Sequence, residues 1–276
     1  MPSSNFICLR YYVVPVQYDL FRQNVGDIEK NNIFRAKFLV NNNYRLTDTR
    51  EYAVRINSVL DGMYYGKLSK KNIAEKHELT PTDIQDDSQD DWPYLNFVAD
   101  TTPGNQLFVV EKKAKIFQSI EGLKNILRQI AKKTMMYTGF TVNFEPIVKK
   151  LVFWNIIKDS DSIYSLKFSL ESPNMLGASA TAREGLKELQ TIFNNSTATV
   201  QLENPDGQLI VPETRVETYR EYVDQGGGSW ELGVGQNGEK KTYRSIENAI
   251  QLKEKIIKED IVNILAKVVE KFKALL

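Results

Sequence analysis

Segment 95–133 constrains the fold most, because it encodes two strands and a helix in direct succession. Four of the six residues at 95–100 are apolar and predict a strand, and the Thr-Pro-Gly-Asn sequence at 102–105 predicts a turn. Residues 107–113 predict the returning strand, and Ser119 is a suitable N-cap for the helix that follows. A hairpin that leads into a helix favours an α+β fold in which antiparallel sheets carry packed helices.

The rest of the chain is consistent with this fold class. Segments 6–21 and 31–40 are rich in aromatic and branched residues and predict strands, whereas the polar segment 69–93 predicts a connecting loop. The 276 residues suffice for one large domain or for two lobes. We expect any such lobes to be a strand-rich amino-terminal lobe with a basic helix, 1–150, and a carboxy-terminal α+β lobe, 151–276.

The carboxy-terminal segment predicts one long helix. From Ser245 to Phe272 apolar residues recur on one face, with lysine and glutamate on the other. A continuous helix of this length would span roughly 45 Å. Its apolar face would cover the sheet of its own chain or pair with a second subunit, and we expect a homodimer.

Charge is segregated along the chain although the formal net charge is only +1. Residues 82–92 contain five aspartates and no cation, whereas residues 111–133 contain seven lysines or arginines against two glutamates. A partner with fixed charge, such as nucleic acid or an acidic protein, would respond to these patches and not to their sum.

Several classes of protein are disfavoured by the composition. Cys8 is the single cysteine and His77 the single histidine, so neither a cysteine zinc cluster nor a histidine-based catalytic triad is expected. No segment has the length and apolar character of a signal peptide or a membrane span. We therefore expect a cytoplasmic protein with no membrane insertion and no cofactor.

The predicted helix after Ser119 carries Lys124, Arg128 and Lys132 at four-residue spacing, which places the three cations on one face. Such a face can simply be solvated, or it can contact phosphates with salt-dependent and sequence-independent affinity. Nearby lysines would extend this surface. The predicted contacts with double-stranded DNA are Lys112, Lys113, Lys115, Lys124, Arg128 and Lys132.

An enzymatic alternative uses the same region. Asp100, Glu111 and Lys113 fit the loose spacing of the Asp…Glu-x-Lys arrangement found in metal-dependent nucleases. Two carboxylates would hold Mg²⁺, and the lysine two residues beyond the second would lie on the same side of the strand, close to the attacking water. The structural alternative is a hairpin whose polar ends face water.

The glycine-rich segment 226–238 contains a formal Gly-x-Gly-x-x-Gly sequence. A strand-like run follows it, and not the helix that a dinucleotide site requires, so Asn237-Gly238 predicts a hairpin turn. Trp230 could then lie at an exposed tip and contact a partner. A third alternative is therefore a protein-interaction or assembly module that uses this hairpin and the carboxy-terminal helix without binding nucleic acid.

The layout as a whole resembles a known group of proteins. The hairpin and helix at 95–133, the strand sequence at 140–146, segment 162–174, the Gly/Trp hairpin and the final helix follow one another as in RexA-like prophage exclusion proteins and related uncharacterised bacterial phage-defence proteins. This resemblance implies a dimeric, non-enzymatic DNA-binding protein of a bacterial anti-phage module, with a partner protein from the same defence operon. It matches no diagnostic motif, so no functional residue is carried over from it.

Overall fold

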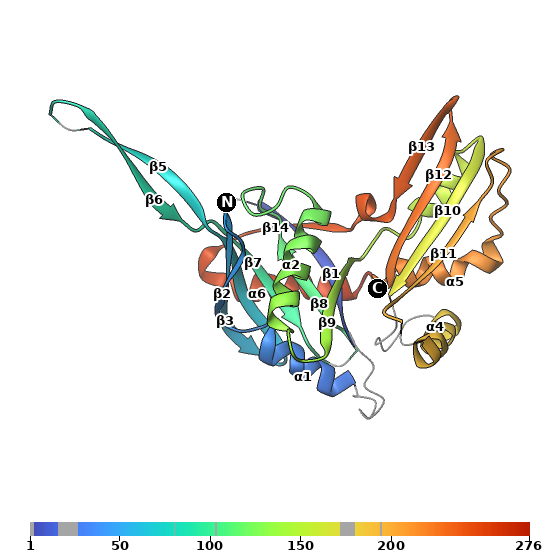
Figure 1. The fold of residues 1–276 in the computed structure, drawn as a ribbon, viewed down its shortest axis with the longest axis horizontal. Helices are drawn as coiled ribbons and strands as arrows, with labels where there is room; N and C mark the ends of the chain where they lie inside the picture. The colour runs from blue at the N-terminus through green and yellow to red at the C-terminus, as the bar shows by residue number, and fades with distance from the viewer. Residues whose placement is uncertain (1–2, 16–26, 80, 103, 172–179, 194) are drawn as a thin grey trace.

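The computed structural model describes residues 3–15, 27–79, 81–102, 104–171, 180–193 and 195–276. It confirms the α+β fold class, with antiparallel sheets and packed helices (Figure 1).

A large sheet forms the centre of the molecule. Its strands follow the order β14-β1-β8-β7-β4-β3-β2, and β9 pairs with the second half of β1. The pairings between these strands are antiparallel. The strands are β1 (Ser3–Pro15), β2 (Asn42–Thr47), β3 (Arg50–Leu60), β4 (Met63–Lys70), β7 (Tyr94–Asp100), β8 (Leu107–Glu111), β9 (Phe140–Pro146) and β14 (Gln251–Lys255).

Helices cover both faces of this sheet. One face packs against α1 (Asp27–Lys37) and α2 (Ile120–Thr134), with Phe34 and Phe38 in an aromatic cluster that includes Tyr11. The other face packs against α6 (Ile261–Lys273). Each face therefore has its own apolar core, which alternating residues of the same strands supply.

A smaller four-stranded sheet forms a second lobe. Its order is β11-β10-β12-β13, and three helices contribute to the apolar core on one of its faces (Figure 1). Trp230 lies in this core and is 2% exposed, so the prediction that it marks an exposed tip was wrong. The Asn237-Gly238 turn between β12 and β13 is confirmed. The elements are α3 (Val152–Lys158), β10 (Ser162–Glu171), α4 (Ala180–Phe193), β11 (Thr197–Glu203), α5 (Glu213–Asp224), β12 (Gly228–Gln236) and β13 (Glu239–Arg244).

After the second lobe the chain returns to the first sheet. Strand β14 pairs with β1, and α6 packs on the same sheet, so the end of the expected lobe 151–276 belongs with the amino-terminal lobe. The segment predicted as one long helix is broken into η1 (Ser245–Asn248), β14, η2 (Lys258–Asp260) and α6. The single long helix was therefore wrong, because the free edge of β1 takes the middle of that segment as a strand. The apolar face of α6 is buried within the chain, through Leu265, Val268, Val269 and Phe272.

Two other predictions from sequence fail in the first lobe. Most of segment 31–40 lies in helix α1 and not in a strand, whereas β1 confirms the strand at 6–15; residues 16–21 lie outside the described part of the chain. Segment 69–93 is not a plain loop, because it contains β5 (Asn72–Leu79) and β6 (Ile84–Asp91). These two strands pair only with each other and form an arm that projects from the body (Figure 1).

Candidate functional site

Helix α2 lies beside β2, the edge strand of the large sheet, and it also contacts β9. Its N-cap is Ser119, whose hydroxyl accepts a hydrogen bond from the amide of Gly122 at 3.0 Å. Leu123, Leu127 and Ile130 anchor the helix in the core at four- and three-residue spacing. Polar residues of α2 lie along the line where the helix meets strands β2 and β3. We call this line the seam.

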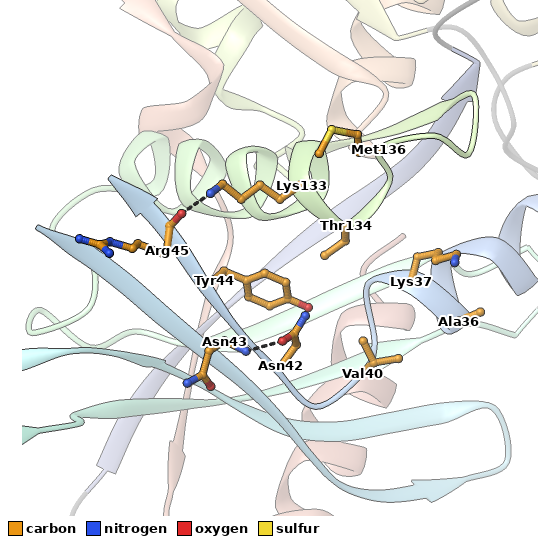
Figure 2. A pocket seen from close by; sticks show the side chains of 10 residues that line it. All are labelled: Ala36, Lys37, Val40, Asn42, Asn43, Tyr44, Arg45, Lys133, Thr134 and Met136. Atoms are coloured by element: carbon orange, nitrogen blue, oxygen red, sulfur yellow. Dashed lines mark hydrogen bonds between the residues drawn. The ribbon is translucent and has the colours of Figure 1, made fainter. Parts of the chain in front are cut away.

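A hollow of about 540 Å³ opens at the carboxy-terminal end of this seam (Figure 2). Three cations line it: Lys37 from the end of α1, Arg45 from β2 and Lys133 from α2. The ammonium group of Lys133 donates a hydrogen bond to the carbonyl oxygen of Arg45 and so fastens α2 to the edge strand. The side chains of Asn42 and Asn43 add amide groups to the same hollow.

Tyr44 forms part of the inner wall of this hollow. The residue is 4% exposed, and its hydroxyl group lies beside the side chain of Asn42 without a hydrogen bond of normal geometry (Figure 2). Burial raises the pKa of Tyr44, so the hydroxyl stays protonated and can donate. A buried donor without a full partner is costly, and a ligand oxygen that reached it would supply the missing bond.

A second hollow of about 490 Å³ lies at the amino-terminal end of the seam. Its cations are Arg50 from β3, Lys70 from β4 and Lys115 from the loop before α2. The amide side chains that line it are Gln118, Asn125 and Gln129.

We call the two hollows together the basic groove. It is lined by six cations, and no carboxylate side chain is among the described residues that line either hollow. Among the described residues Arg45 alone of the six has a carboxylate within ion-pair distance, the fully exposed Asp48 at 3.3 Å. Uncompensated cations on a concave surface create a positive potential that attracts anions. The six cations are Lys37, Arg45, Arg50, Lys70, Lys115 and Lys133.

Lys124 does not belong to the exposed surface on which the sequence placed it. Its side chain is 8% exposed and pairs with Glu145 of β9 at 2.8 Å. The expected exposed row of Lys124, Arg128 and Lys132 was therefore wrong at its first member, because a lysine on the flank of α2 is drawn to a buried carboxylate. Arg128 is exposed and close enough to Glu145 to influence its pKa, so it lies on the side of α2 away from the groove.

The other predicted DNA contacts have different positions. Lys132 is exposed on α2, and Lys115 lines the basic groove. Lys112 is exposed directly after β8. Lys113 is partly exposed and pairs with Glu111 at 2.8 Å. Of the six cations proposed from sequence, the structure thus places Lys115 in the groove.

The three residues of the nuclease alternative are not brought together. Asp100 faces Leu107 across the β7–β8 hairpin, and Leu107 lies four residues from Glu111, which corresponds to roughly 13 Å along the strand. Glu111 is fully buried and accepts hydrogen bonds from Ser4 at 2.6 Å and Asn96 at 2.7 Å. Two carboxylates this far apart cannot share one Mg²⁺.

Asp100 has its own set of partners at the other end of the hairpin. Its carboxylate accepts hydrogen bonds from the amide and hydroxyl of Thr102, at 2.9 and 2.6 Å, and from the Asn105 side chain at 2.8 Å. Lys273 of α6 pairs with it at 2.9 Å. In the described part of the chain no three His, Cys, Asp or Glu side chains are grouped so that they could hold a metal ion.

A second polar cluster lies where the two lobes meet. Glu145 of β9 and Glu171 of β10 are both buried, and Asn143 donates a hydrogen bond to Glu171 at 2.7 Å. Burial raises the pKa of Glu145, although Lys124 lowers it in part. Burial and the nearby charge of Glu145 raise the pKa of Glu171 to about 7. This cluster joins the lobes and can take up a proton near neutral pH.

Five groove cations are absent from the contacts predicted from sequence: Lys37, Arg45, Arg50, Lys70 and Lys133. They come from five different elements, and three of them have no neighbouring cation in the sequence, whereas Lys70 and Lys133 each stand next to one other lysine. The signal that could have identified these cations is weaker than a run of like charge: each of them lies at or near the end of a helix or strand, next to a turn.

Comparison with models of known protein families finds no match for this chain. Comparison with curated proteins finds no significant match either. None of the helices in the described residues combines the length and the apolar character needed to cross a membrane.

Proposed function

We propose that the basic groove binds the phosphate backbone of double-stranded DNA without reading its sequence. The observation that carries this proposal is the gathering of six cations and five side-chain amides in the two hollows beside α2, with no carboxylate among their described lining residues. Lysine and arginine provide the sequence-independent part of DNA affinity, and amide side chains add hydrogen bonds to phosphate oxygens.

The aromatic residues of the groove favour contacts with the backbone over binding of unpaired bases. Tyr44, Tyr52 and Phe117 line the hollows, but each is at most 4% exposed. Proteins that hold single strands stack bases on accessible aromatic rings. With the rings of the lining residues buried, no ring in these hollows is accessible for stacking a base, whereas the charged and amide groups can contact a duplex backbone.

The test is a salt titration of DNA affinity with a matched pair of triple variants. Changing Arg50, Lys70 and Lys115 to glutamine removes three groove charges. The affinity for duplex DNA is expected to fall, and the slope of log K against log salt is expected to shrink by about 3, since each phosphate contact contributes about 0.9. Fluorescence anisotropy with a labelled duplex of arbitrary sequence measures both quantities.

The control changes Lys158, Lys167 and Lys253, which are exposed on other surfaces, to glutamine. It has the same net charge as the groove variant and is expected to bind DNA like the unmodified protein. If both triple variants lose affinity equally, the binding depends on overall charge and the groove is not the site.

We propose a bacterial anti-phage defence or prophage exclusion module as the setting of this activity. Support comes from the resemblance in layout to RexA-like proteins, together with the groove. Expression of the chain in bacteria is expected to reduce plaque formation only if the groove is intact, and any partner protein of the module would be supplied in the same experiment. Equal plaque counts with the groove variant and the unmodified protein would contradict a defence role through DNA.

A further inference from the structure

The arm formed by β5 and β6 extends outward from the body of the molecule (Figure 1). It projects from the junction of β4 and β7 and makes its strand pairings within itself (Figure 1). Strand register runs from Asn72 opposite Asp91 to Leu79 opposite Ile84. Two-stranded hairpins without further packing are marginally stable in water, so an arm of this length is expected to gain stability from a partner.

The composition of the arm indicates what kind of partner it fits. Residues 72–91 contain seven acidic residues and one lysine. The side chains of Glu75, Asp83 and Asp91 are exposed, while Asp90 pairs with Lys71 at the base of the arm. Such a density of negative charge on a projecting element is complementary to a cationic surface.

The basic groove of the same chain is a surface of this kind. The sequence of the arm has seven acidic residues, and six cations line the groove. Among the described residues that line the groove there is no acid that would repel the arm. The dimensions also agree: each eight-residue strand of the arm is about 26 Å long, and the fifteen-residue helix that borders the groove is about 22 Å long.

Apolar side chains strengthen the match. Ile73 and Leu79 of the arm are 72% and 82% exposed, which is unusual for large aliphatic residues on one small element. Met136 at the rim of the groove is 56% exposed. Contact between such side chains would remove apolar surface from water on both molecules.

We propose that the arm of one molecule docks in the basic groove of a second copy of the chain. The arm points away from its own body (Figure 1), so its own groove is out of reach without rearrangement at its base. Reciprocal exchange of two arms gives a closed, two-fold dimer in which each groove is filled. The carboxylates of the arm then occupy the positions that phosphates take in the proposed function, so dimer formation and DNA binding exclude each other.

This exclusion rests on the proposed function, but the docking itself does not. At low salt and micromolar concentration the protein is expected to have twice the chain mass by light scattering, and rising salt is expected to return it to the monomer. Changing Glu75 to glutamine and Asp83 and Asp91 to asparagine is expected to give a monomer that binds DNA more tightly, because competition by the arm is removed. The matched control changes Glu184, Glu188 and Asp206, exposed acids of the second lobe, in the same way, and it is expected to remain a dimer.

A charge swap tests the contact directly. Glu75→Lys with Asp91→Lys in the arm, or Lys70→Glu with Lys115→Glu in the groove, is expected to give a monomer. The four changes in one chain are expected to restore the salt-sensitive dimer while DNA binding stays lost. A monomeric unmodified protein at low salt, or a dimer that survives the arm changes, overturns the docking and leaves DNA binding intact. DNA binding that ignores the groove changes overturns the proposed function and leaves the docking intact.

Discussion

Glu171 shows how a single buried carboxyl group can make stability depend on pH. It lies at the lobe junction with Glu145, Lys124 and Arg128 as its charged neighbours and Asn143 as its hydrogen-bond donor. Burial raises its pKa from 4.5 to about 7, so the folded protein holds this proton more tightly than the unfolded chain does. Where the folded state binds more protons, the free energy of unfolding falls as pH rises. The part of the free energy of unfolding that depends on Glu171 is therefore lost between about pH 4.5 and pH 7.

The Glu171→Gln variant keeps an acceptor for Asn143 but has no charge to bury. Its free energy of unfolding is expected to equal that of the unmodified protein near pH 4.5 and to exceed it above pH 7 by up to about 3 kcal/mol. Urea denaturation at the two pH values measures this difference. Glu188→Gln, at an exposed position of α4, is the control and is expected to have no effect at either pH. A difference that is the same at both pH values would contradict the titration of Glu171 in this range.

The β7–β8 hairpin uses its two acids as structural groups at opposite ends. Asp100 closes the turn by accepting three hydrogen bonds and ties the hairpin to α6 through Lys273. Glu111 ties the other end to β1 and β7 through Ser4 and Asn96. Buried carboxylates with so many donors are costly to remove, since their donors lose their partners.

Asp100→Ala is expected to lower the free energy of unfolding by about 2 to 4 kcal/mol, because Thr102, Asn105 and Lys273 lose a common acceptor. Asp48→Ala, at a fully exposed position, is the control and is expected to leave the free energy of unfolding unchanged. Thermal melting with and without millimolar Mg²⁺ is expected to give the same midpoint for the unmodified protein. A midpoint that rises with Mg²⁺ and no longer does so in Asp100→Ala would show that this carboxylate binds metal.

Helices, strands and turns could be predicted from sequence where the local pattern fits only one kind of secondary structure. The hairpin at 95–111, the helix after Ser119 and the Asn237-Gly238 turn all follow from local sequence and are present. Segment 31–40 failed because Phe34 fits either periodicity, and the deciding contact is its stacking on Tyr11 at 4.2 Å, a residue far away in sequence.

The candidate site was predictable only in part, for the same reason. Lys115 could be found in a basic run, but Arg50 and Lys70 reach the groove through strand pairing that no local pattern encodes. By spacing alone Lys124 belongs to the predicted exposed row with Arg128 and Lys132. Its side chain is buried because it pairs with the buried carboxylate of Glu145. Spacing along a helix identifies a face, whereas the fold decides whether that face is covered.

On the scale of the whole molecule, the second lobe is an insertion in the first. The chain leaves the large sheet after β9 and returns to it at β14, and the two connections lie side by side: the amide of Lys149 donates to the carbonyl of Asn248 at 3.1 Å. All six groove cations lie between residues 37 and 133, in the first lobe. The groove therefore depends on the second lobe only through the contacts that hold the lobes together.

The returning segment, by contrast, completes the first lobe. Helix α6 buries Leu265, Val268, Val269 and Phe272 against the sheet. At about 1.5 to 3 kcal/mol for each buried apolar side chain, these four residues contribute on the order of 10 kcal/mol, as much as the whole stability of an ordinary domain. Loss of the last 26 residues of the chain should therefore lower the stability of the first lobe more than loss of the inserted lobe does.

Two deletions test this architecture. A chain that ends at residue 250 is expected to be unfolded, whereas a chain in which a short Gly-Ser linker replaces residues 150–247 is expected to unfold cooperatively and to bind duplex DNA. The second variant exposes Tyr12 and Val14, which pack against the inserted lobe, so a lower melting temperature than that of the complete chain is expected. Circular dichroism during heating reports folding, and anisotropy with the labelled duplex reports the groove. A folded chain without residues 251–276, together with an unfolded chain without the inserted lobe, would show that the core of the first lobe is completed by the insertion and not by the returning segment.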